Sequence, residues 1–178
     1  MPTPTVTDED LLRLPRDGRK YEFVDGEVRV SPAGGRHGEV SGYLVALLVT
    51  FVKPRKLGKV FDSSTGFRMS KGNLRAPDAS FVAADRLPDG KAPTGFFEIR
   101  PDLAVEVLSP TDDAREVLDR VGEYLAGGTR MMWVIDPQAR RAAVYRSLTD
   151  VRQIEEDGVL DGEEVVPGFR CHLSEVLE

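Results

Sequence analysis

Two carboxylates stand at positions in the sequence where an acidic side chain is costly. Asp78 immediately precedes the apolar run Ala79–Ala83, and Glu106 interrupts the apolar run at residues 103–108. An ionised carboxylate on a buried strand costs several kcal/mol to desolvate unless it pairs with a cation or binds a metal ion. Asp78 and Glu106 are therefore the first candidates for chemistry in this chain.

A divalent metal site would account for this pair of acids. Two carboxylates that converge from adjacent strand ends can hold Mg²⁺ or Mn²⁺ through their oxygens, and the main-chain carbonyl of Val107 could add another oxygen ligand. Such an ion activates water and neutralises charge on a phosphate. The competing interpretation is structural, with Glu106 paired to a buried arginine or lysine. The spacing of the residues leaves both interpretations open.

The N-terminal part of the chain is expected to supply a short helix and a hairpin. Thr7, with Asp10 three residues later, has the pattern of a helix N-cap. Residues 20–24 and 27–30 are joined by Asp25-Gly26, which predicts a tight β-hairpin because both turn residues tolerate positive φ. The hairpin is expected to join the central sheet and make that sheet mixed rather than purely parallel.

Two longer helices are predicted from apolar residues at helical spacing. The first covers residues 37–52 and is expected to stop at Pro54. The second covers residues 111–125, with Thr111 or Asp112 as its N-cap and two glycines closing it. The second helix is amphipathic, and the first is interpreted as a core helix.

The strands between these helices predict one central sheet. The apolar runs at 103–108 and 131–135 flank the second long helix, and a strand–helix–strand crossover of this kind places two parallel strands in a buried sheet. Residues 141–146 and 151–154 predict a more exposed antiparallel extension. The fold class is therefore α/β (α+β), a mixed central sheet flanked by helices with an added β-hairpin near each end, in a single domain over residues 1–178.

The composition is that of an ordinary globular protein. The chain has 178 residues, of which 40% are hydrophobic and 30% charged. Its formal net charge of −6 argues against binding nucleic acid by bulk attraction, although a local basic groove or a metal-neutralised site is compatible with it. The single cysteine, Cys171, excludes an internal disulfide. No apolar run reaches the ~20 residues that span a membrane, and no signal peptide is evident, so a cytoplasmic location without membrane contact is expected.

Several short motifs recur in the order and with the spacing of a known family. They are the run at residues 21–27 (Tyr-Glu-Phe-Val-Asp-Gly-Glu), His37, Ala76-Pro77-Asp78, the run at 103–110 (Leu-Ala-Val-Glu-Val-Leu-Ser-Pro), Trp133-Val134-Ile135-Asp136-Pro137, and a Val-Pro-Gly-Phe-Arg ending at 166–170. Together they resemble the Uma-two family of the PD-(D/E)XK restriction-endonuclease-like superfamily. Each motif alone is weak, but the first five in register, with the ending also similar, cover nearly the whole chain and are fairly specific.

The resemblance implies a nuclease site. Asp78 and Glu106 match the metal-binding acidic pair of the family. Glu22 falls on a position where it could be an additional metal or water ligand, and His37 could contact the metal, a phosphate or a water. The resemblance also implies a restriction-endonuclease-like fold around these residues.

The sequence departs from the family pattern at the catalytic lysine. Leu108 occupies the superfamily lysine position, two residues after Glu106. In the Uma-two family a lysine comes instead from the following helix, four residues before a tyrosine, and here that position holds Arg120. Arginine stays charged and cannot act as a base at ordinary pH, but it can stabilise a phosphate or a transition-state oxyanion. The replacement puts catalysis in doubt and leaves binding possible.

Each of these residues also has an ordinary structural interpretation. Glu22 could be a hairpin charge opposite Arg29, and His37 could cap or pack a helix start. The default structural interpretation of Arg120 is an i, i+4 ion pair with Glu116 on the helix surface.

Three functions follow as hypotheses. The first is a Mg²⁺- or Mn²⁺-dependent endonuclease that hydrolyses phosphodiester bonds in nucleic acid, with DNA as the expected substrate. The second is a catalytically degenerate nuclease fold that binds nucleic acid or a protein. The third is a structural or interaction protein in which Glu106 pairs with a buried base. A homodimer is expected because nuclease folds of this kind often act on two strands.

Overall fold

A computed structural model describes residues 7–15, 20–31 and 34–178 of the chain. In addition to three short 3-10 turns, its elements in chain order are α1 (Asp8–Leu12), β1 (Lys20–Val24), β2 (Glu27–Ser31), α2 (Gly35–Arg55), β3 (Gly58–Asp62), β4 (Phe67–Arg68), β5 (Leu74–Arg75), β6 (Ala79–Ala83), β7 (Leu103–Val107), α3 (Ala114–Ala126), β8 (Met131–Asp136), β9 (Arg141–Tyr145), β10 (Val151–Glu155), β11 (Val159–Asp161), β12 (Arg170–His172) and α4 (Leu173–Val176).

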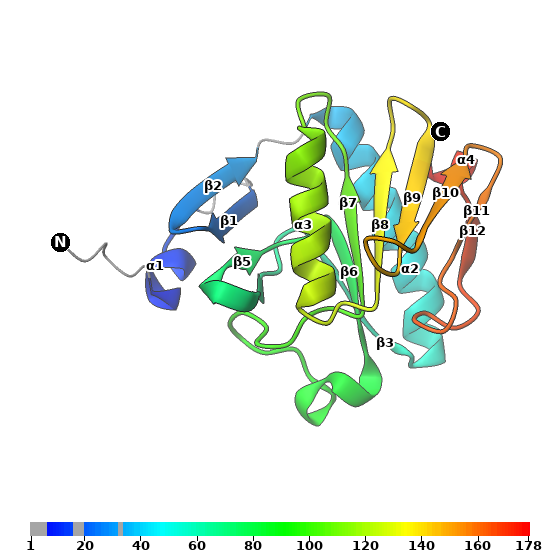
Figure 1. The fold of residues 1–178 in the computed structure, drawn as a ribbon. Coiled ribbons are helices and arrows are strands. Elements are labelled where there is room, and N and C mark those ends of the chain that lie inside the picture. The colour runs from blue at the N-terminus through cyan, green and yellow to red at the C-terminus, as the bar shows by residue number, and fades with distance from the viewer. Residues whose placement is uncertain (1–6, 16–19, 32–33) are drawn as a thin grey trace.

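The central sheet has six strands in the order β10-β9-β8-β7-β6-β3. Only β7 and β8 run parallel in it, joined through α3, and the other neighbours are antiparallel. Figure 1 shows α3 on one face of this sheet and α2 on the other. The prediction of a mixed central sheet flanked by helices, with a crossover through the second long helix, is confirmed.

Two layers of buried side chains hold the helices to the sheet. Alternate residues of the strands point to opposite faces. Val105 and Trp133 belong to the layer under α2, together with Leu44 and Leu48 of that helix. The opposite layer, under α3, contains Ala104, Met132 and Val134 of the strands and Val117, Val121 and Tyr124 of the helix. Glu106, two residues after Ala104, therefore faces α3.

The N-terminal hairpin forms at Asp25-Gly26 as predicted, but it does not join the central sheet. It belongs to a separate four-stranded sheet in the order β2-β1-β5-β4. The expectation that the hairpin makes the central sheet mixed was wrong. Strands β5 and β4 are only two residues long, and such short segments give no periodicity from which their pairing with β1 could be read.

The C-terminal part extends the central sheet. Strands β9 and β10 form the second predicted hairpin. Tyr145 pairs with Val151 at the turn, and Arg141 pairs with Glu155 at the open end. Strands β11 and β12 make a small sheet of their own, and α4 follows directly. The single cysteine, Cys171, lies buried in β12.

The helix ends differ in detail from the prediction. Thr7 caps α1 and exchanges hydrogen bonds with Asp10, as expected. Helix α2 runs through Pro54 to Arg55, because proline has a helical φ and its missing N–H removes only one bond of the last turn. The N-cap of α3 is Asp113, whose side chain accepts from the N–H groups of Arg115 and Glu116, and is neither of the two predicted residues. Within the described residues, no helix is long and apolar enough to cross a membrane.

Candidate active site

The pairing of β6 with β7 places the two candidate carboxylates opposite each other. The antiparallel ladder ends with Ala79 paired to Val105, and the Asp78 N–H donates to the Val105 carbonyl at 2.9 Å. Asp78 lies one residue before this pair and Glu106 one residue after it, so the two acids share the face under α3. Both side chains are 2% exposed. Two like charges across a ladder destabilise a sheet unless a cation neutralises them.

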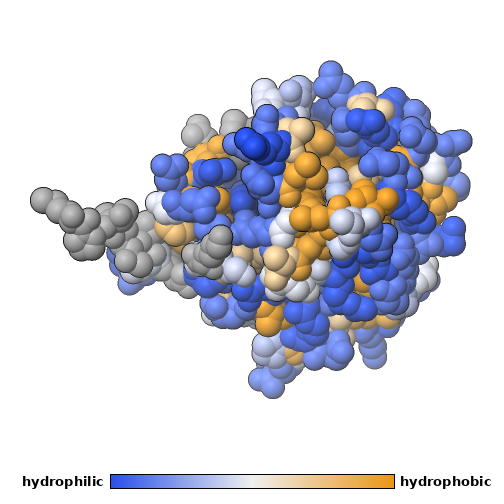
Figure 2. All heavy atoms as spheres, viewed as in Figure 1, coloured by the Kyte–Doolittle hydropathy of each residue, from blue (hydrophilic) through white to orange (hydrophobic). Residues whose placement is uncertain are grey.

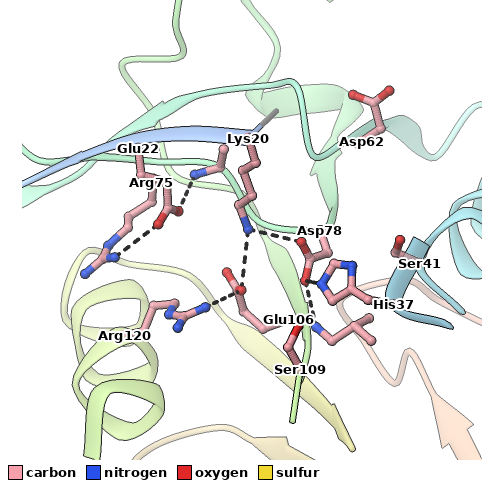
Figure 3. Close-up of polar contacts among 12 residues, drawn as sticks. Lys20, Glu22, His37, Ser41, Asp62, Arg75, Asp78, Glu106, Ser109 and Arg120 are labelled. Atoms are coloured by element: carbon pink, nitrogen blue, oxygen red, sulfur yellow. Dashed lines mark hydrogen bonds and ion pairs between the residues drawn. The ribbon is translucent and has the colours of Figure 1, made fainter. Parts of the chain in front are cut away.

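Three donors hold the Asp78 carboxylate (Figure 3). Lys20 Nζ lies 3.0 Å from Oδ1, while His37 Nε2 lies 3.0 Å and the Val107 N–H nitrogen 2.8 Å from Oδ2. Burial raises the pKa of Asp78, but the charge of Lys20 and the hydrogen bonds from His37 and Val107 outweigh it and lower the pKa to about 2. Asp78 is therefore an ionised, firmly oriented carboxylate at neutral pH.

Glu106 is held on one side only. Its Oε2 accepts from Arg120 Nη1 at 2.8 Å and lies 3.6 Å from Lys20 Nζ. Its Oε1 is buried and has no hydrogen-bond partner among the described residues. Burial, reinforced by Asp78, raises the pKa of Glu106 to about 7 against the opposing charges of Lys20 and Arg120. An oxygen left unpartnered in this way can accept a bond from an added ligand.

Lys20 is the site residue that sequence reasoning missed. Strand β1 pairs with β5 through Phe23 and Leu74, and continuing this antiparallel register brings Lys20 alongside Pro77, next to Asp78. The Lys20 side chain is 12% exposed. Burial lowers the pKa of Lys20, but the charges of Glu106, Asp78 and Glu22 raise it above its ordinary value, so its amine stays an ammonium. The two-residue alternation along the strand shows only that Lys20 and Glu22 share one face of β1.

Glu22 supports the strand that carries Asp78. It lies opposite Arg29 in the hairpin register, as expected. Its carboxylate, however, accepts from the Ala76 N–H at 2.9 Å and lies 3.3 Å from Arg75 Nη1. Arg75 also donates to Glu123 of α3 at 2.7 Å. Glu22 thus fixes the segment leading to Asp78, and the prediction that it binds metal or water stays a prediction.

His37 and Arg120 approach the acids from the two helices. His37 lies in the first turn of α2, where Gly34 is the N-cap, so the interpretation of His37 as a capping residue was wrong. Its bond to Asp78 raises the pKa of His37. Arg120 contacts Glu106 and, at 3.3 Å, Asp112. The expected pairing of Arg120 with Glu116 was therefore wrong.

The donor set suits a hard divalent cation only in part. Asp78 and Glu106 offer carboxylate oxygens, which Mg²⁺ and Mn²⁺ prefer, and the unpartnered Oε1 of Glu106 is free to accept. In the described part of the chain, no three His, Cys, Asp or Glu side chains gather tightly enough to hold a metal by themselves. Mg²⁺ tolerates this because it commonly keeps several waters and binds through one or two carboxylates. The Val107 carbonyl stays a predicted ligand, since the contact seen is through the Val107 N–H.

Known proteins resemble this chain in sequence and fold. The family described as "Uma2: Putative restriction endonuclease" matches residues 8–174. A solved structure described as "a putative nuclease belonging to DUF820 from Anabaena variabilis ATCC 29413" is 23% identical and superposes with a TM-score of 0.81. The match covers 97% of this chain and 98% of that chain, and at this identity it establishes the fold. No curated protein matches the chain.

Proposed function

The chain belongs to the Uma2 family of restriction-endonuclease-like proteins, and we propose that it hydrolyses phosphodiester bonds in DNA with a divalent metal ion. The observation that carries this proposal is the pair of buried carboxylates, Asp78 and Glu106, placed across one strand pair with an oxygen of Glu106 unpartnered. A purely structural ion pair would not require two acids at the same point of the sheet.

The surrounding residues fit distinct roles in such a reaction. A bound Mg²⁺ or Mn²⁺ would supply a Lewis acid and activated water. Asp78 and Glu106 would hold the ion, while His37 and the Val107 N–H keep Asp78 oriented. Arg120, anchored by Glu106, would place its guanidinium beside the scissile phosphate and stabilise the charge that develops there. Arg120 is a charge-stabilising group in this scheme and does not act as a base.

Metal removal tests the proposal. We expect the purified protein to nick or cut DNA in Mn²⁺ or Mg²⁺ and to lose this activity completely in EDTA, with recovery when the ion is restored. A broad panel should include supercoiled, linear and single-stranded DNA as well as RNA. Cleavage that persists unchanged in EDTA would contradict metal dependence, and cleavage of RNA alone would contradict the assignment of DNA as substrate.

We also propose that the protein acts in the cytoplasm as a homodimer. Two copies of one site can cut the two strands of a duplex, and most homo-oligomers are symmetric dimers. Figure 2 shows hydrophobic side chains gathered over α3 and the strands beside it. Leu118 of α3 is 49% exposed and Leu148 is 58% exposed. A dimer that uses this face should dissociate when Leu118 is replaced by aspartate. Sedimentation of the parent as a single ~20 kDa species at micromolar concentration would contradict it.

A binding module without catalysis is the second candidate. It is favoured by Arg120 at the position of the family lysine and by the cations that already neutralise both acids. This candidate predicts binding of DNA or a protein with no cleavage under any metal condition. The Mn²⁺ experiments separate it from the nuclease.

A further inference from the structure

The ammonium of Lys20 lies between the two carboxylates of the site. It is 3.0 Å from Oδ1 of Asp78 and 3.6 Å from Oε2 of Glu106. Figure 3 shows the lysine reaching from β1 toward both acids, while Arg120 approaches Glu106 from α3 on another side. Lys20 is thus the one cation with contacts to both acids among the described residues. A positive charge at this point has the position that a metal ion shared by the two acids would need.

We propose that Lys20 is a positioning residue that holds Asp78 and Glu106 together in the metal-free protein and competes with the divalent metal for them. This inference rests on the proposed function, because it concerns the same metal site. Oδ2 of Asp78 already accepts from His37 and Val107, so a metal ion would have to take Oδ1, where Lys20 now lies, together with the open Oε1 of Glu106. Metal binding would then require the ammonium to leave Oδ1. Occupation of the site by metal and release of Lys20 would be one coupled event.

The construction of the hairpin supports this role. Glu22, two residues along β1, is tied to Ala76 and Arg75, so the strand that carries Lys20 is fixed to the segment that carries Asp78. Lys20 is the first residue of β1 and reaches the acids through a flexible four-carbon stem. The backbone can therefore stay in place while the ammonium moves. Such a motion needs only side-chain rotation and no movement of β1.

Competition and mere structural support predict opposite effects on metal affinity. If Lys20 only supported the fold, Lys20→Met would loosen the acids and weaken Mn²⁺ binding. If it competes, the same variant should bind Mn²⁺ more tightly, by about ten-fold, which corresponds to the loss of ~1.4 kcal/mol of ion pairing. Lys20→Arg keeps the charge and should bind Mn²⁺ close to the parent value. Arg29→Met is the matched control, since it removes the same charge from an exposed position of the same hairpin.

Labelling of the unmodified protein gives an independent readout. Reductive methylation followed by peptide mass spectrometry reports which lysine amines are accessible. Lys20 should be protected without metal and become labelled several-fold faster in saturating Mn²⁺, while the exposed Lys91 should label equally in both conditions. The labelling experiment requires no variant, so it tests competition between Lys20 and the metal even if Lys20→Met does not fold.

The results separate this inference from the proposed function. Tighter Mn²⁺ binding by Lys20→Met together with metal-induced labelling would support competition even if no nucleic acid were cleaved. Lys20 that stays protected in saturating Mn²⁺, or a Lys20→Met variant that folds and binds Mn²⁺ no better than the parent, would overturn it even if DNA cleavage were robust. If the parent failed to bind Mn²⁺, binding by Lys20→Met alone would support the inference, and its absence there too would overturn it.

Discussion

Replacing Asp78 with asparagine is expected to lower metal-dependent DNA cleavage about a thousand-fold, because a bound ion contributes several kcal/mol of transition-state stabilisation. The amide keeps the shape of the side chain, and its oxygen can still accept from the Val107 N–H, which lies 2.8 Å from Asp78 Oδ2 in the parent. It loses the negative charge that a cation needs. Steady-state cleavage of the best DNA substrate measures the effect.

Glu106→Gln should produce a loss of the same size with little change in fold. Burial already raises the pKa of Glu106 to about 7, so a neutral side chain at this position is compatible with the surrounding structure. Circular dichroism and the melting temperature serve as folding controls for both variants. Full activity in either variant would show that the replaced residue does not bind the metal. Loss of activity together with loss of fold would show that the substitution affects stability.

Arg75→Met is expected to lower the free energy of unfolding strongly. The Arg75 side chain is 9% exposed and bridges Glu22 of β1 to Glu123 of α3. Removing one partner of a buried ionic network leaves uncompensated charges, here two carboxylates, at a cost of about 3–5 kcal/mol. Urea unfolding should therefore show a lower midpoint with an unchanged slope.

The exposed Arg29 provides the control for this prediction. Arg29→Met removes the same charge from the hairpin that Arg75 helps to hold, and it should change the free energy of unfolding by no more than about 0.5 kcal/mol. If Arg75→Met lowers the free energy of unfolding by less than about 1 kcal/mol, the bridge between β1 and α3 contributes little to stability. The position of Lys20 beside Asp78 would then depend on other contacts.

Local signals in the sequence were sufficient for much of the fold. The Asp25-Gly26 turn, the apolar periodicity of α2 and α3, and the apolar runs of β7 and β8 each depend on neighbouring residues, and each was predicted correctly. The predicted start of α3 was less accurate, because several neighbouring residues can serve as its N-cap. Asp113 caps α3 because its carboxylate reaches two free N–H groups, while the adjacent Asp112 is used by Ser109 and Arg120.

The candidate site could be predicted only where position along the chain carried the signal. Asp78 and Glu106 were identified because an acid beside or within an apolar strand is costly. Lys20 was missed because its approach to them depends on the pairing of β1 with the two-residue strand β5, which no local pattern reveals. The partners of Arg120 were wrong for a related reason. Helix periodicity indicates neighbours on the helix, such as Glu116, and is silent about Glu106 on the sheet beneath.

A calorimetric Mn²⁺ titration of the parent protein beside Asp78→Asn and Glu106→Gln decides whether these two carboxylates form a metal centre. It needs no knowledge of the substrate. We predict that the parent binds Mn²⁺ and that both variants lose this binding while remaining folded. A parent protein that binds no Mn²⁺, or an Asp78→Asn variant that binds it as well as the parent, would contradict a metal centre at these two carboxylates.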